Sequence, residues 1–218
     1  MTSVWELAAF TAATALVATA LMLVPGVGLA WLLARKDFRG KTLVETAVSL
    51  PLVLPPVATG LLLLWVFGRR GPLGSLFGAI GIEVVFTPAA VVLAMTVMGL
   101  PLLVRTARAG FEQVTRRHEQ LAETLGAGPW RVFTTVTIPL SAKTILAGAI
   151  LGFSRALGEF GATIVVAGSI PGRTQTLAVG LYSFIETGQD QKALAVLALS
   201  MALACGAVFV SNRLARQA

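Results

Sequence analysis

Long apolar runs limit most strongly what this chain can fold into. The first run, from Leu7 to Ala34, contains no charged residue. A helix needs about 20 apolar residues to cross the hydrocarbon core of a bilayer. Charged residues make up 12% of the chain, whereas soluble domains carry about 25%. We therefore expect an all-α polytopic membrane protein, built as one domain over residues 7–212.

Five runs are long enough to be membrane spans: residues 7–34, 43–67, 86–104, 140–168 and 193–212. A sixth span would require a helix expected at Leu177–Ile185 to cross, and this helix is short for that task. The first run follows no basic segment, which argues against a cleavable signal peptide. We expect about five transmembrane helices in the cytoplasmic (inner) membrane.

Basic residues indicate the orientation, because they concentrate in the cytoplasmic loops of membrane proteins. Alternate loops between the runs carry 12 of the 17 Lys and Arg residues: Arg35, Lys36, Arg39, Lys41, Arg105, Arg108, Arg116, Arg117, Arg131, Lys143, Arg213 and Arg216. These loops are therefore cytoplasmic, with the N-terminus outside and the C-terminus inside. This bias explains the net charge of +7 better than nucleic-acid binding does.

Residues 110–139 form the longest polar interruption, which the charge bias places in the cytoplasm. Leu121, Ala122 and Leu125 recur at helical spacing and predict a short amphipathic helix. Gly126 is expected to close this helix, since glycine adopts the left-handed conformation found at helix ends. Pro139 is expected to open the next apolar segment. The interruption is thus a helix offered to a soluble partner.

The second run contains Pro51, Pro55 and Pro56. Three prolines remove three backbone donors. One interpretation is a broken helix packed inside the bundle beside a pathway. The other is a helix that is merely bent.

Two opposite charges, Arg155 and Glu159, interrupt the fourth run. They lie four residues apart and share a face of a helix. A charge inside the membrane is costly unless it faces the bundle interior or water. The pair is either a gate or pathway element for an ion, or a structural ion pair that holds a bent helix. In the outer loops, Arg69, Arg70 and Arg173 would either attract an anion or serve solubility.

The sequence contains no complete motif for nucleotide binding, metal binding or hydrolytic catalysis. Gly40-Lys41-Thr42 looks like the end of a phosphate-binding loop, but Arg35 stands where that loop needs glycine. The single His118 lacks the His and Cys partners of a metal site. Neither an H-E-x-x-H nor a G-x-S-x-G motif occurs. We expect a transport subunit without a nucleotide site of its own, and without a metal, a cofactor or a catalytic residue.

The stretch from Gln120 to Gly126, followed by Val136-Thr-Ile-Pro139, resembles the "EAA" loop of binding-protein-dependent ABC importer permeases. That pattern is Glu-Ala-Ala, three residues, Gly, nine residues and Ile-x-Leu-Pro. Ala122, Gly126 and Pro139 match it, whereas Gln120 and Leu121 replace a Glu and an Ala. Five further segments look like the molybdate permeases, and sulfate permeases share the fourth and a similar fifth: Pro51–Pro56, Phe67–Gly71, Gly126–Phe133, Arg155–Ala162 and Ile170–Thr176.

The resemblance implies a type I ABC importer permease fold and a homodimer that forms the pathway. Two cytoplasmic ATPase subunits would bind ATP, and an outer binding protein would deliver a tetrahedral oxyanion. Molybdate is the expected substrate, with tungstate and sulfate as alternatives. A non-transporting membrane scaffold, which recruits partners through residues 110–139, is the alternative from another class.

Residues are thus expected at two sites, the first from the resemblance and the second from the prolines and the charged pair described above. The ATPase-coupling site would comprise seven residues: Glu119, Gln120, Leu121, Ala122, Leu125, Gly126 and Pro139. The translocation pathway or gate would comprise four: Pro55, Pro56, Arg155 and Glu159.

Overall fold

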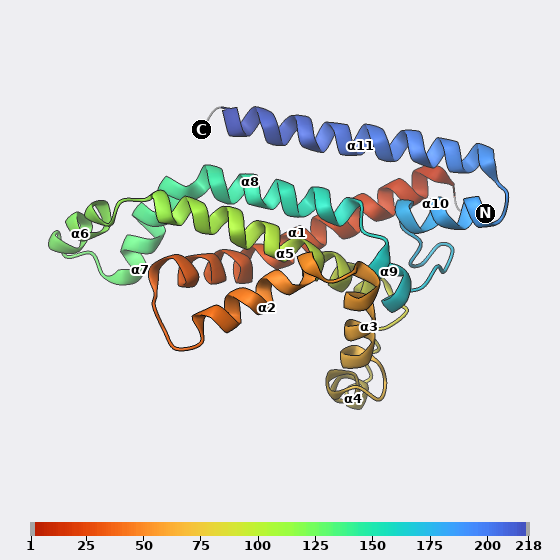
Figure 1. Ribbon diagram of the computed structural model, residues 1–218, viewed down its shortest axis with the longest axis horizontal. Coiled ribbons are helices and arrows are strands. Elements are labelled where there is room, and N and C mark those ends of the chain that lie inside the picture. Colours follow the sequence, from red (N-terminus) through yellow and green to blue (C-terminus); the bar gives the residue numbers. More distant parts are fainter. Residues whose placement is uncertain (1–2, 217–218) are drawn as a thin grey trace.

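The computed structural model describes residues 3–216, and this part of the chain is helical without any strand. Three long helices form the centre of the bundle (Figure 1): α1 (Val4–Arg35), α5 (Pro88–Gln113) and α8 (Ile138–Leu157). α1 packs along α5, and α5 packs along α8. Helix α11 (Asp190–Arg216) lies against α8 and against α10 (Leu177–Glu186).

Small side chains let the central helices approach closely. Gly99 of α5 and Gly152 of α8 lie side by side, and a Cβ on Gly152 would stand 3.3 Å from the carbonyl oxygen of Gly99. Met22 of α1 fills the space beside both glycines, because its Cε would lie 2.9 Å from that Cβ. Buried alanines from α1, α5 and α8 continue this core. Close backbone approach is how membrane helices gain packing energy.

Three helical segments are long and apolar enough to cross a membrane: α1, α5 and the continuous segment Pro129–Leu157. A fourth span results if α2 (Lys41–Val53) and α3 (Pro56–Phe67) count as one interrupted helix. The chain is therefore a multi-pass membrane protein. The predicted span 193–212 lies in α11, and it stays a prediction, as does the total of five. α10 is a short apolar helix at the place expected for residues 177–185.

The second predicted span is broken and not merely bent, whereas its place beside a pathway stays a prediction. α2 (Lys41–Val53) and α3 (Pro56–Phe67) meet at an angle of 118°. Leu54 and Pro55 between them have extended ψ angles of 144° and 133°. Pro55 and Pro56 have no N–H to donate, so the helix loses two hydrogen bonds where it turns. Pro51 stays inside α2.

The fourth predicted span is also interrupted. α8 ends at Leu157, and the short α9 (Gly161–Val166) follows after a turn. The helix of this span starts earlier than expected. α7 (Pro129–Val132) and a π-helical turn, η1 (Phe133–Thr137), are continuous with α8. Pro139 lies in the first turn of α8, at the start of the apolar segment as expected, although the continuous helix already begins at Pro129. Because Pro139 cannot donate a hydrogen bond, the turn before it adopts the wider π geometry.

The two chain ends mark opposite ends of the bundle. The N-terminus and α10 lie at one end, whereas the C-terminus, α6 (Arg116–Thr124) and α7 lie at the other (Figure 1). α3 and α4 (Pro72–Ala79) project sideways from the bundle (Figure 1). The predicted loop 110–139 thus contains the end of α5 followed by α6, α7 and η1.

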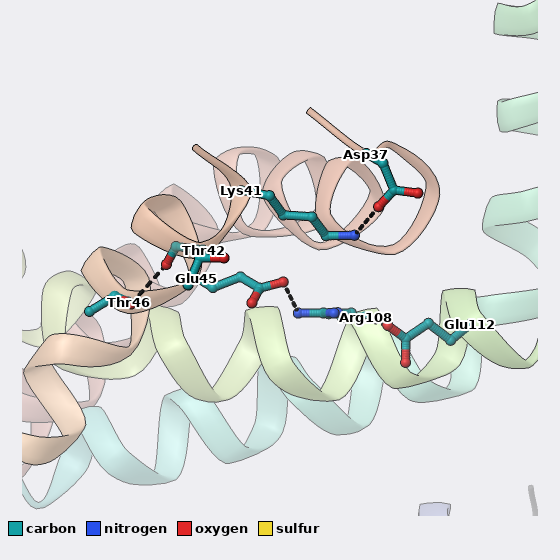
Figure 2. A network of polar contacts seen from close by, with 7 residues as sticks. All are labelled: Asp37, Lys41, Thr42, Glu45, Thr46, Arg108 and Glu112. Carbon is teal, nitrogen blue, oxygen red and sulfur yellow. Dashed lines mark hydrogen bonds and ion pairs between the residues drawn. The ribbon is translucent and has the colours of Figure 1, made fainter. Parts of the chain in front are cut away.

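Polar pairs tie α2, which has no buried residue, to the bundle (Figure 2). Arg108 of α5 contacts Glu45 of α2 and Glu112 of its own helix, each at 2.7 Å. Lys41, the first residue of α2, donates to Asp37 in the preceding loop at 2.9 Å, and this hydrogen bond lowers the pKa of the Asp37 carboxyl. The Arg108–Glu45 pair joins α2 to α5, beside the partly buried Val44 and Val48 that pack on the core.

Packing of α3 on α9 leads to a stability prediction. A Cβ on Gly60 would lie 2.8 Å from both the Cα and the carbonyl oxygen of Ala162. These are backbone atoms, so α3 and α9 must separate to admit it. We expect Gly60→Ala to destabilise the protein by about 1–3 kcal/mol, a typical cost of overpacking. Thermal unfolding in detergent measures this.

The matched control is Gly28→Ala in α1, where a new Cβ meets nothing within 4 Å. This change should leave the unfolding temperature unaltered or slightly raised, since alanine favours helix more than glycine does. Equal unfolding temperatures for the two variants would contradict the contact between α3 and α9.

Candidate functional site

α6 offers an apolar surface at the end of the bundle. None of its residues is buried. Leu121 is 54% exposed, Leu125 is 87% exposed and Trp130, in α7, is 75% exposed. We call these three residues the α6 surface. Gln120 is exposed beside it, and Ala122 is half-buried. Exposed leucines on an otherwise charged helix are suited to contact another protein.

Gly126 closes α6 as predicted. Its φ of +84° is left-handed. The Gly126 N–H donates to the carbonyl of Glu123 at 2.9 Å, and the Ala127 N–H donates to the carbonyl of Ala122 at 3.0 Å. This pair of bonds is the Schellman arrangement, which satisfies the last carbonyls of a helix. The α6 surface is thereby held on a helix with a defined end.

Glu119 differs from the other predicted coupling residues, because its side chain faces the bundle and is only 16% exposed. Its Oε1 accepts from Nη2 of Arg35 at 3.0 Å and from Oγ1 of Thr137 at 2.7 Å. We call Arg35, Glu119 and Thr137 the Glu119 node. Pro139 is exposed two residues after Thr137. The roles of Arg35 and Thr137 could not be read from the sequence, since both lie far from residue 119 in the chain.

Arg155 and Glu159 form an ion pair of 2.7 Å at the end of α8. Glu159 is 1% exposed, whereas Arg155 is 27% exposed. The other Glu159 oxygen, Oε1, accepts from the Ala162 N–H at 2.7 Å and so satisfies the start of α9. The pair therefore has a structural task at the helix break, and the arginine keeps one accessible side.

The two helix breaks near the predicted gate residues pack on each other. A Cβ on Gly161 would lie 2.6 Å from Cβ of Pro56, so the break before α9 packs on the break before α3. We call residues 55–56 and 158–161 the break junction. Two buried hydroxyls belong to the helices that follow these breaks, Thr59 in α3 and Thr163 in α9. Neither has a hydrogen-bond partner within residues 3–216. Neither threonine stands out in the sequence as a site residue, since a hydroxyl inside an apolar run is common.

Two of the three arginines predicted to lie outside share a pocket. Arg69 and Arg173 line a cavity of about 780 Å³ bounded by α3, α4 and the loop before α5. Arg69 is paired with Glu83 at 2.7 Å. In the described part of the chain, no three His, Cys, Asp or Glu side chains are grouped to hold a metal.

Because Glu159 is more deeply buried than Arg155, we expect the two partners to differ in how much stability is lost when each is replaced. Arg155→Met would leave the Glu159 carboxylate buried and unpaired, which costs about 3–5 kcal/mol. Glu159→Gln should cost less, because an amide oxygen can still accept from Ala162 and the remaining guanidinium is partly solvated. Thermal unfolding of the purified variants measures the two losses. A larger loss for Glu159→Gln would refute this account.

The sequence matches a family of membrane transport proteins over most of its length. The family model of the binding-protein-dependent transport system inner membrane component matches residues 26–216. The molybdenum transport system permease protein ModB of Escherichia coli K12 is 47% identical over 88% of this chain and 84% of its own length. The probable sulfate transport system permease protein of Marchantia polymorpha is 35% identical over 94% of this chain and 71% of its own.

Among solved structures, the MetNI methionine ABC transporter in an inward-facing conformation has the same fold. Its matching chain superimposes with a TM-score of 0.70 at 16% identity, covering 98% of this chain and 93% of that one. The resemblance inferred from the sequence motifs is therefore confirmed. This chain belongs to the family of binding-protein-dependent transport system inner membrane components.

Proposed function

We propose that this chain is the permease subunit of an ATP-driven importer that moves molybdate across the cytoplasmic membrane. The observation that carries this proposal is the 47% identity to a molybdenum permease over 88% of the chain. Tungstate and sulfate are the alternative substrates, because both are tetrahedral dianions and a sulfate permease is 35% identical.

Two copies of the chain would form the pathway, with an outer binding protein that supplies the anion and two ATPase subunits beneath. The N-terminus would lie outside and the C-terminus inside, with five spans. Support comes from the basic residues Arg35, Lys36, Arg116 and Arg117, which belong to the end of α1 and the start of α6. Such clustering is typical of a cytoplasmic face.

The α6 surface would dock on an ATPase subunit, which would bring the ATP. Leu121 and Leu125 supply the apolar anchor, and Gly126 holds the end of the helix. Gln120, Ala122 and Pro139 border this contact, whereas Glu119 lies behind it. Exposed leucines that point away from the bundle support this role.

The break junction would form the gate. A dianion cannot enter hydrocarbon, so a polar route must open between helices. Irregular backbone is tolerated at membrane depth only where it is buried in protein or lines such a route. Pro55, Pro56 and Glu159 lie at that irregular backbone. Arg155 lies in the last turn of α8 next to it, and its accessible side carries the positive charge that an anion needs.

Uptake by the complex in proteoliposomes tests the proposal. The permease is reconstituted with its ATPase and binding protein, and labelled molybdate is supplied outside. We expect ATP-dependent accumulation that unlabelled molybdate and tungstate suppress more strongly than sulfate does. Absence of any oxyanion accumulation, despite a complete complex, would favour the scaffold function.

Gly126 provides a second test. Its φ of +84° is unfavourable for a β-branched residue, and forcing one there costs about 1–3 kcal/mol. We expect Gly126→Val to lower uptake per ATP hydrolysed by roughly tenfold, because the end of α6 unwinds. Membrane insertion should be unchanged, as judged by the yield of purified protein.

Gly128→Val is the matched control. Gly128 lies in the same turn and also has open space around it, but its φ is −69°, which valine adopts readily. Its uptake per ATP should stay near that of the wild type. Equal losses in both variants would mean that the bulk of the new side chain, and not the end of α6, matters.

A further inference from the structure

We propose that Glu119 is a positioning residue that locks α6 to the bundle, so that a displacement of α6 is passed on to α1 and α8. This inference rests on the proposed function of α6 as the contact with an ATPase. It assigns a role to the Glu119 node that differs from partner contact, because the Glu119 carboxylate faces inward and is 16% exposed.

The first side of the node is Arg35, the last residue of α1. Its Nη2 donates to the Glu119 carboxylate at 3.0 Å and to the carbonyl of Val114 at 2.8 Å. Val114 follows the end of α5, and Glu119 is in the first turn of α6. One guanidinium therefore holds both sides of the turn between these helices. Its side chain is only 10% exposed, so water competes little for these bonds.

The second side is Thr137, the last residue of the π turn. Nearby threonines in this segment use their hydroxyls differently: Thr134 and Thr135 donate to carbonyls of their own helix, Trp130 and Arg131. Thr137 instead donates across to Glu119 at 2.7 Å. It is 1% exposed. A bond to a charged acceptor is about twice as strong as a neutral one.

Without this node α6 would be free to pivot. It has no buried residue, and its main packing is against α7 and η1. The turn at Gly126–Gly128 follows it on one side, and residues 114–115 precede it on the other. A partner pulling on α6 would then only rotate it. With the node closed, the same pull reaches the segment Pro129–Leu157, a continuous helix that ends beside Arg155.

The experiment measures the position of α6 and the coupling separately. Spin labels are placed at Arg117→Cys in α6 and at Leu21→Cys in α1, both exposed positions, with the single Cys205 replaced by Ser. Double electron–electron resonance on the assembled complex gives the distribution of distances between the labels. Uptake per ATP hydrolysed is measured on the same variants without labels.

The variants are Glu119→Gln, which removes the charge, and Thr137→Val, which keeps both charges and the shape but loses one hydrogen bond. Thr135→Val is the control, since the Thr135 hydroxyl bonds only within its own helix. We expect Glu119→Gln and Thr137→Val to broaden the distance distribution and to lower uptake per ATP by at least about fivefold, at the lower end of typical coupling between sites. Thr135→Val should match the wild type in both.

Two results would overturn the inference: an unchanged distance distribution in both variants, or unaltered uptake per ATP despite a broadened one. If Glu119→Gln fails to assemble, Thr137→Val decides alone. A wild-type complex that accumulates no oxyanion would refute the proposed function instead, while the width of the distribution would still show whether the node holds α6.

Discussion

Two interrupted helices meet at their breaks, and the rest of the structure depends on that contact. Hydrocarbon offers no partner to free backbone groups, so a break inside a membrane must be satisfied by the protein itself. Pro55 and Pro56 have no N–H to leave unpaired, and Glu159 accepts the N–H of Ala162. Gly60 and Gly161 let the two backbones touch. The Glu159 carboxylate, which satisfies the backbone at the break before α9, also places the Arg155–Glu159 ion pair beside this contact.

One helical segment connects this contact with the far end of the molecule. It begins at Pro129, passes through the π turn and ends at Leu157, just before the break junction. The Glu119 node joins its first turns to α1 and α6, whereas the Arg155–Glu159 pair joins its last turn to α9. Glycines and alanines of this segment pack closely against α1 and α5 between the two ends. A rigid element with a polar attachment at each end is suited to transmit a displacement.

Local features were predictable because they depend on a few neighbouring residues. The spacing of Leu121 and Leu125 predicted α6, and Gly126 predicted its end, since only glycine accepts the left-handed turn without strain. Pro55 and Pro56 predicted an interruption, although its angle of 118° depends on what α3 packs against. Pro139 marks the first turn of α8, but it does not reveal that the helix already begins at Pro129, through a π turn that precedes the proline.

Amino-acid order alone determined that this chain lies in a membrane, that the second span contains an interruption, where α6 ends, and which family the chain belongs to. Apolar length, charge bias and short motifs are all properties of contiguous residues. Tertiary structure decided which polar side chains face one another. Glu119 and Gln120 are neighbours in the chain, yet only Glu119 turns inward to Arg35 and Thr137. Likewise Pro56 and Gly161 meet although about a hundred residues separate them, since long-range packing brings together segments that no local pattern relates.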